Sequence, residues 1–287
     1  MKAIQDTELI ITKDKKIYHL NLDKKQIADD IILVGDQDRV CQISKHFDEI
    51  TDKIKHREFV THTGTLNGKR ISAIATGIGP DNIDIVINEL DALVNIDFQT
   101  RTINKNKKKL NLIRLGTSGA LQKDIEVDTF IAASYGLGFD GLAYFYEDKE
   151  KLEKEMAISY ISHAKWPSKL ASPYFIKASS CLLEKFSDIK KGITATAPGF
   201  YGPQGRTLRI APSINNLHKD MTSFKYNDNI ITNFEMETSA LYYLGQTLGH
   251  NTLTICSIIG NRLTKQYSNN YKKTVERMID LVLNRIC

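Results

Sequence analysis

Leu110-Asn111-Leu112-Ile113-Arg114-Leu115-Gly116 is a short apolar run that ends in glycine, and it decides the fold class. Similar runs, rich in β-branched residues, lie at 30–35, 71–77 and 252–260. Helical patterns lie at 81–95, 233–248 and 271–285. Strands that read as continuous apolar runs are buried on both faces, and their alternation with helices indicates crossover connections. The sequence therefore predicts an α/β protein with a central mixed, mostly parallel twisted sheet flanked by helices.

The composition is that of a globular protein: 287 residues, of which 41% are hydrophobic and 25% charged, with 17 Gly and 6 Pro. These values exclude the collagen-like and disordered classes. No linker, repeat or shift in composition divides the chain, so we expect one domain over residues 1–287, with residues 1–16 as an N-terminal extension. The chain has no apolar run of about 18 residues and no basic-then-apolar start, so neither a membrane partner nor a secretory signal is expected.

The net charge of +5 is modest, and much of it comes from one lysine-rich segment, residues 105–109. This segment lacks interleaved aromatic residues, so it predicts a solvated loop and no nucleic-acid partner. The four cysteines are scattered and form no C-x-x-C pair. This spacing fits neither a zinc site nor a disulfide scaffold, so we expect no metal, reduced thiols and a cytoplasmic location.

Three of the expected strands end in glycine beside a hydroxyl or a charged group, at Gly35, Gly77 and Gly116. A single glycine of this kind merely closes a strand. In open α/β sheets, however, ligands bind outside the carboxyl ends of the strands, where backbone N–H groups and helix N-termini receive anions. Three such glycines therefore predict a ligand crevice, although none matches a P-loop or a dinucleotide fingerprint.

Charged residues flank these glycines. Arg39 and Arg114, together with the Thr117 hydroxyl, could bind a phosphate without a metal, because a guanidinium matches phosphate in a bidentate manner. The alternative is that each arginine forms a structural pair with a carboxylate. Glu235 and Glu237 fall at the start of the helix expected over 233–248, where they either accept from sugar hydroxyls or favour the helix dipole.

In its ordered motifs the chain resembles the nucleoside phosphorylases of the uridine phosphorylase type, from about residue 17 to residue 283. The matching stretches are 18–20, 35–40, 56–59, 76–79, 114–120, 200–206, 233–237 and 261–262. The resemblance implies the fold of that family and the cleavage of a pyrimidine nucleoside, uridine first, to the free base and (deoxy)ribose 1-phosphate. It implies inorganic phosphate as co-substrate and no cofactor. It also implies a homo-oligomer, a dimer or a hexamer, whose subunits share active sites.

The resemblance also assigns residues to the phosphate and the ribose. It implies phosphate contacts from Gly35, Arg39, Arg114 and Thr117, joined by Arg57 of a neighbouring subunit. For the ribose, it implies that Glu237 takes the hydroxyls and that Met236 packs on the sugar. It further implies that His19 of the neighbour reaches the 5′-hydroxyl, whereas without the family His19 reads as a surface residue.

The base is expected to lie among Ser118, Gly119, Phe200, Gln204, Arg206 and Ile259. Gln204 offers a donor and an acceptor for the N3–H and O2 of uracil, and Arg206 faces O4, where the charge of the leaving anion spreads. Arg114 and Arg206 are therefore the expected catalytic residues. Purine-cleaving relatives tend to carry an acid in the segment that here spans 258–262, and this chain has none there.

Two alternatives remain: a purine nucleoside phosphorylase or nucleosidase of the same fold, and a non-catalytic nucleoside-binding homologue. The missing acid argues against the first, and the retained phosphate residues argue against the second. The turn Gly79-Pro80-Asp81-Asn82 lacks the serine usual in bacterial uridine phosphorylases, which weakens the case for a monovalent cation site. Segments 95–109 and 144–174 are longer than in the compact bacterial members and carry no assigned motif.

Overall fold

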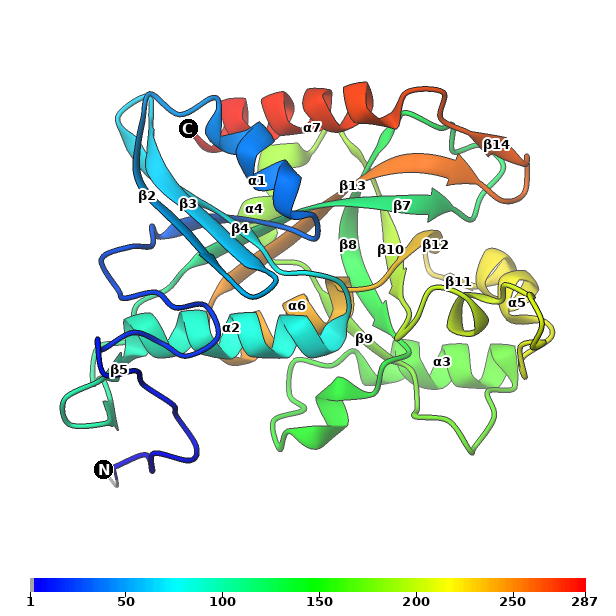
Figure 1. Ribbon diagram of the computed structural model, residues 1–287. Helices are drawn as coiled ribbons and strands as arrows, with labels where there is room; N and C mark the ends of the chain where they lie inside the picture. The colour runs from blue at the N-terminus through cyan, green and yellow to red at the C-terminus, as the bar shows by residue number, and fades with distance from the viewer. Residues whose placement is uncertain (1–2) are drawn as a thin grey trace.

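The computed structural model describes residues 3–287, and its centre is a 12-stranded mixed sheet (Figure 1). Four strands match the predicted apolar runs: β1 (Asp30–Val34), β4 (Lys69–Ala75), β7 (Asn111–Ala120) and β13 (Asn251–Asn261). They lie parallel and adjacent in the order β4-β1-β7-β13. The predicted α/β class and mixed sheet are thereby confirmed.

The rest of the sheet brings in the antiparallel pairings. Its strands are β2 (Glu49–His56), β3 (Phe59–Leu66), β8 (Phe130–Gly138), β9 (Tyr174–Lys177), β10 (Lys190–Thr196), β11 (Lys225–Tyr226), β12 (Asn229–Glu235) and β14 (Gln266–Tyr267). β10 runs parallel to β8 and β12, whereas β13 meets β8 antiparallel and the end of β7 meets β12 antiparallel. The carboxyl ends of β7 and β12 therefore lie side by side.

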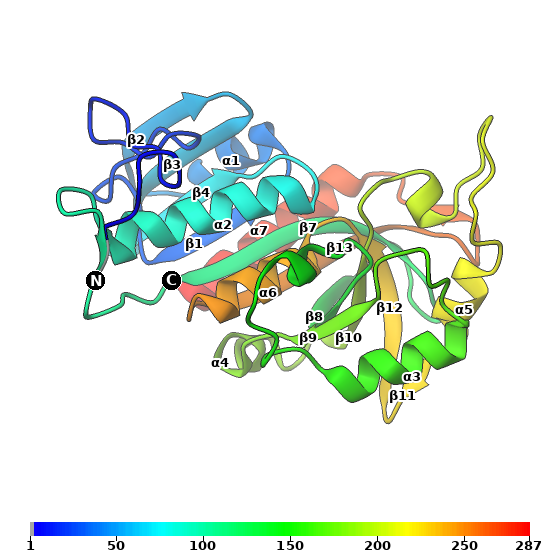
Figure 2. The ribbon, with the colours of Figure 1, turned by 90° about the horizontal axis from the view of Figure 1, so that it is seen from below.

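Helices cover both faces of the sheet, as predicted. α2 (Pro80–Asn95) and α6 (Thr238–Thr247) pack with Ile31 and Leu33 on one face (Figure 2). α1 (Gln37–Ser44) and α7 (Tyr271–Ile286) pack with Ile32 and Val34 on the other. These four of the five β1 side chains are fully buried, which is why the strand reads as one continuous apolar run.

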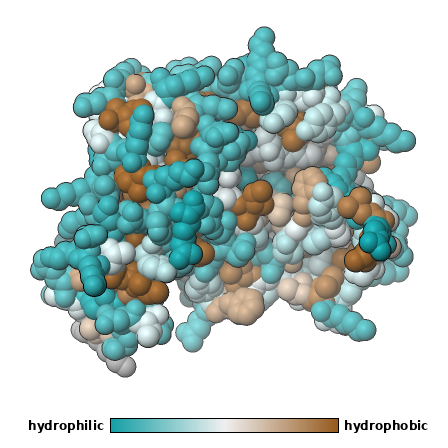
Figure 3. All heavy atoms as spheres, viewed as in Figure 1, coloured by the Kyte–Doolittle hydropathy of each residue, from teal (hydrophilic) through white to brown (hydrophobic). Residues whose placement is uncertain are grey.

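The remaining elements lie at the periphery. They are η1 (Leu142–Phe145), α3 (Lys154–Ala164), α4 (Ser180–Leu183), η2 (Glu184–Phe186), η3 (Gly202–Gln204), α5 (Leu217–Ser223) and the two-stranded β5 (Ile96–Asp97) and β6 (Thr102–Ile103). Residues 105–109 form the predicted exposed loop. In the view of Figure 3, apolar side chains form scattered groups among hydrophilic ones. Within residues 3–287, no helix has the length and apolar character needed to cross a bilayer.

Two local predictions are wrong. Gly116 does not end a strand, since β7 continues to Ala120. The helix expected over 233–248 begins only at Thr238, because residues up to Glu235 pair with β10 and β7 as the end of β12. Both corrections concern segments that build the candidate site.

Candidate functional site

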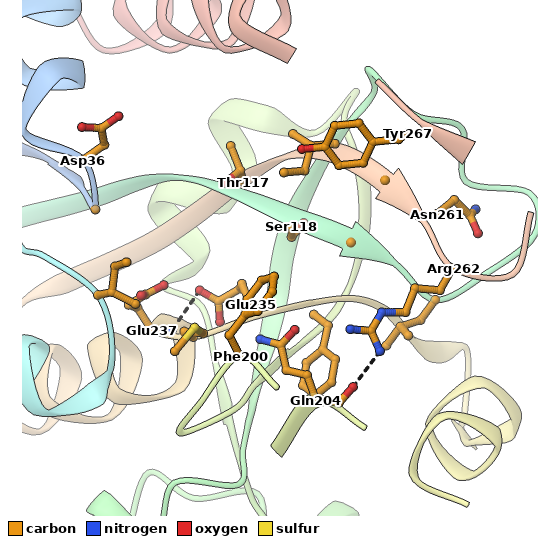
Figure 4. A pocket seen from close by; sticks show the side chains of 18 of the residues that line it. Asp36, Thr117, Ser118, Phe200, Gln204, Glu235, Glu237, Asn261, Arg262 and Tyr267 are labelled. Atoms are coloured by element: carbon orange, nitrogen blue, oxygen red, sulfur yellow. Dashed lines mark hydrogen bonds between the residues drawn. The ribbon is translucent and has the colours of Figure 1, made fainter. Parts of the chain in front are cut away.

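A cavity of about 1010 Å³ opens where β1, β7, β12 and β13 end, and the loop between β10 and α5 closes one side of it (Figure 4). The predicted site residues that line it are Gly35, Arg39, Arg114, Thr117, Ser118, Gly119, Phe200, Gln204, Arg206, Met236, Glu237 and Ile259. We call the part around Arg39, Arg114 and Glu237 the sheet end, and the part around Gln204 and Arg206 the loop end. His19 and Arg57 lie outside the cavity of their own chain.

Gly116 gives Arg114 room to reach the sheet end. An added Cβ at Gly116 would lie 2.0 Å from a terminal nitrogen of Arg114, so the guanidinium folds back over the glycine within β7. Arg114 is only 5% exposed. The glycine in this motif is therefore required by the close approach of a side chain, and not by a turn.

A second guanidinium lies beside the first. Arg39, in the first turn of α1, donates to the backbone carbonyl of Leu115 at 3.1 Å, and Asp36 caps the same helix by accepting from the Asp38 N–H. Burial and the neighbouring Arg114 lower the pKa of Arg39. Two guanidiniums this close favour a bound anion between them.

Carboxylates balance Arg114. Its guanidinium contacts Glu237 and lies 3.1 Å from Glu235, and these charges outweigh burial and raise its pKa. Glu237 also accepts from the Gly79 N–H at 2.9 Å, while Glu235 accepts from Thr196 and from the N–H groups that begin α6. The predicted alternative of a structural ion pair thus describes Arg114 in part, although the Nε of Arg114 is buried without a hydrogen-bond partner.

The Glu237 carboxylate has a shifted pKa. Burial raises its pKa above the ordinary carboxylate value, with Glu235 adding to the rise and Arg114 opposing it. Met236 lies between the two acids on the cavity wall. The break between β12 and α6 therefore places a polarised carboxylate and a thioether on one wall, where both can face a ligand.

The loop end is built from residues of the loop between β10 and α5, and some of them are exposed. Gln204 is 3% exposed and accepts from Arg206 through Oε1 at 2.6 Å, while the Arg206 guanidinium lies 3.6 Å from the centre of the Phe200 ring. Phe200 itself is about half exposed. Arg206 takes one of the two lone pairs of the Gln204 Oε1, and the amide Nε2 is a donor that can face a ligand.

Arg262 is a functional candidate that the sequence reasoning left out of the site. It lines the loop end and donates to the backbone carbonyl of Gln204 at 2.6 Å. Asn261 beside it is committed to the fold, because its amide donates to the carbonyls of Gln122 and Ile125 and accepts from the chain that follows. The Asn261-Arg262 motif was the available signal for Arg262, but nothing in the sequence separated the roles of the two residues.

His19 and Arg57 lie together on the surface although 38 positions separate them in sequence (57 − 19). Arg57 donates to the Tyr18 hydroxyl at 3.1 Å, and His56 contacts the His19 carbonyl at 2.8 Å. The His19 ring is held by Glu89 at 2.7 Å. The two residues predicted to serve a neighbouring subunit thus form one ordered cluster.

Among the described residues, no group of three or more His, Cys, Asp or Glu side chains lies close enough together to hold a metal ion. The turn at residues 77–79 contributes a backbone donor to a residue of the cavity wall. Gly77 and Gly79 have positive φ values of 74° and 100°, and Gly79 presents its N–H to Glu237.

Comparisons with known proteins place the chain in one family. The family model of the phosphorylase superfamily matches residues 29–286. A uridine phosphorylase of Thermococcus kodakarensis is 30% identical over 91% of this chain and 83% of its own length, and a DeoD-type purine nucleoside phosphorylase of Brevibacillus brevis is 28% identical over 93% and 97%. A Trypanosoma brucei nucleoside phosphorylase that shows uridine phosphorylase activity superposes with a TM-score of 0.87 at 27% identity, covering 97% of this chain and 99% of that one.

Proposed function

Because the chain belongs to the phosphorylase superfamily and is a nucleoside phosphorylase, we propose that it cleaves uridine with inorganic phosphate to uracil and ribose 1-phosphate. The observation that carries the proposal is the pairing of two buried guanidiniums at the sheet end with a cationic loop end that has no general acid. The first part suits an oxyanion nucleophile, and the second suits a base that departs as an anion.

At the sheet end, phosphate binds to Arg39, Arg114 and the Thr117 hydroxyl. All three residues line the cavity, so a phosphate there meets two guanidiniums and a hydroxyl. A phosphate oxygen then forms a bond to C1′ as the bond from C1′ to the base nitrogen breaks. Holding both reactants in one cavity makes this step effectively unimolecular.

The ribose lies between the two ends. Glu237 accepts hydrogen bonds from its hydroxyls in the carboxylate form, and Met236 packs against the ring. The contact of Glu237 with Arg114 joins the sugar site to the phosphate site, so that the positive charge developing at C1′ lies near a carboxylate.

At the loop end, Arg206 faces the carbonyl edge of the base and stabilises the uracil anion, and Gln204 donates through Nε2. A purine leaving group would gain from an acid that protonates its ring nitrogen. Asn261 cannot supply that proton, because a carboxamide is not an acid near neutral pH, and its hydrogen bonds to backbone groups hold it away from the base. The absence of an acid at this position supports a pyrimidine.

The base choice is tested with uridine, thymidine, cytidine and inosine in phosphate buffer, by measuring free base and pentose 1-phosphate. Uridine should be cleaved fastest and cytidine refused, because cytosine presents an amino donor to Arg206. Leaving the polar groups of the site unpaired in this way can lower kcat/KM for the wrong substrate by up to about 10⁴-fold. Inosine cleaved faster than uridine would overturn the assignment of the loop end.

A second copy of the chain completes each site by contributing the cluster of His19 and Arg57. Arg57→Ala and Arg114→Ala subunits should each be inactive. After dissociation and mixing in equal amounts they should recover up to about a quarter of wild-type activity, because half of the sites in each hybrid dimer carry neither change. Verified hybrids without activity would contradict shared sites.

A further inference from the structure

His218 lies behind the side chains that face the loop end. It belongs to α5, and its Nε2 lies 2.9 Å from the Gln204 carbonyl oxygen and within hydrogen-bonding distance of a terminal nitrogen of Arg262. That Arg262 nitrogen donates to the same carbonyl at 2.6 Å. The three groups therefore connect α5, the loop that carries Gln204 and the end of β13.

The loop itself rests on the His218 ring. Gly205 has a φ of 66°, and an added Cβ there would lie 2.9 Å from two atoms of the imidazole. Gly205 separates Gln204 from Arg206, so the ring lies beneath the turn that carries both predicted base contacts. A change at His218 therefore acts on the site without touching a ligand.

Arg262 is an unusual cation for a partly buried position. Burial and the nearby Arg206 lower its pKa to about 10, and its second terminal nitrogen is buried without a hydrogen-bond partner. Buried guanidiniums normally pair with carboxylates. Among residues 3–287, however, the hydrogen-bond partners of Arg262 are a backbone carbonyl and an imidazole.

The imidazole has a property that a carboxylate lacks. A guanidinium can only donate, so Nε2 of His218 must be unprotonated to attract Arg262, and in that tautomer the Gln204 carbonyl accepts its hydrogen bond from Arg262 and not from His218. Burial lowers the pKa of His218, Arg262 and Arg206 lower it further, and the contact with the Gln204 carbonyl opposes them in part, so that the net lowering favours the neutral ring. A neutral acceptor orients the guanidinium and leaves its charge uncompensated, whereas a carboxylate would cancel much of that charge.

We propose that His218 is a positioning residue that holds Arg262 at the loop end while leaving its positive charge free for the electron-rich edge of the departing base. The inference rests on the proposed function, because it assigns the charge to the uracil anion. It predicts that the charge of the side chain at position 218 matters more than its shape.

The test compares His218→Gln with His218→Glu, which have the same shape and differ in charge, using uridine and 5-fluorouridine as substrates. We expect the Gln variant to stay within about threefold of wild-type kcat with uridine, and the Glu variant to lose about tenfold or more. The loss should be smaller with 5-fluorouridine, because fluorine stabilises the base anion and reduces its need for a cation. On an Arg262→Gln background, the difference between Glu and Gln at 218 should vanish.

Equal activity of the folded Gln and Glu variants, or equal losses with both substrates, would overturn the inference. Melting temperatures measured in parallel show whether each variant folds. If the Glu variant does not fold, Arg262→Gln with His218 intact takes its place, and a loss no larger for uridine than for 5-fluorouridine overturns the inference. A wild-type enzyme that does not cleave uridine in phosphate would refute the proposed function, and the inference with it.

Discussion

The two ends of the cavity differ in how their charges are held. At the sheet end, Arg39 and Arg114 are at most 9% exposed, project from a helix start and a central strand, and lie beside the carboxylates Glu235 and Glu237. At the loop end, Arg206 lies against a half-exposed Phe200 and is held by the neutral amide of Gln204. One end is fixed by the sheet, whereas the other depends on a loop.

This difference suggests that the sheet end carries the reaction and that the loop end determines which base is accepted. A side chain on a buried strand cannot move without disturbing the core, so the sheet end suits the step that all substrates share. Loops accept substitution more readily and carry specificity in many folds. We therefore expect changes at the sheet end to abolish turnover, and changes at the loop end to alter which nucleoside is used.

Arg114→Ala should show the largest effect. Losing a charge-assisted contact in a dry site costs about 3–4 kcal/mol of transition-state stabilisation, which is about two to three orders of magnitude in kcat/KM. The substitution also leaves Glu235 and Glu237 buried without their cation, so the melting temperature should fall as well. A loss below tenfold in a folded variant would make Arg114 structural.

Glu237→Gln should come next. Hydrogen bonds to charged groups contribute about 1.5–3 kcal/mol, so uridine turnover should fall about 10- to 100-fold, and 2′-deoxyuridine turnover should fall less. Since burial raises the Glu237 pKa and only the carboxylate accepts both hydroxyls, wild-type kcat/KM should decline on acidification from a pH above the ordinary carboxylate range. A pH profile that keeps this acid limb in the Gln variant would assign the limb to another group.

The sheet end could be largely predicted from the sequence because its signals are local. The apolar run 110–115 requires a buried strand, and an arginine inside such a run requires a partner or a ligand. The start of α6 could not be predicted in this way. Asn233 and Phe234 fit a helix by pattern, but pairing with β7 and β10 extends the strand through them, and Glu235 then caps the helix from outside it.

The loop end was predicted less completely because its contacts join distant segments. Gln204, His218 and Arg262 meet only in the folded chain, and no spacing in the sequence relates them. The internal pairing of Arg206 with Gln204 was equally invisible, since two polar residues in a Gly/Pro-rich segment read as a plain loop.

Arg206→Ala should have a moderate effect that differs between substrates. Uridine turnover should fall about tenfold, while any trace of cytidine turnover should change little, because the lost guanidinium contacts only an oxygen at position 4. The ratio of kcat/KM for uridine to kcat/KM for cytidine should therefore fall, and measuring both values tests this directly. An equal loss of kcat/KM for both nucleosides would show that Arg206 acts in the step common to all substrates and does not select the base.

Asn261→Asp should change base choice least. It places an acid where purine-cleaving relatives tend to carry one, but it removes two donors to buried carbonyls, which costs about 1–3 kcal/mol of stability. We expect a lower melting temperature and no gain of inosine cleavage. Thr264→Asp, which adds the same charge at an exposed neighbour, should leave the melting temperature nearly unchanged. Efficient inosine cleavage by Asn261→Asp would show that one acid is enough to change the base.

The dependence of uracil release on phosphate tests most directly the central claim that the sheet end binds the nucleophile. Uridine is incubated with the wild-type protein over a phosphate titration that includes phosphate-free buffer, and uracil and ribose 1-phosphate are both measured. We expect saturable release, one ribose 1-phosphate for each uracil, and no release without phosphate or arsenate. Equal release in phosphate-free buffer, with free ribose as the product, would contradict it.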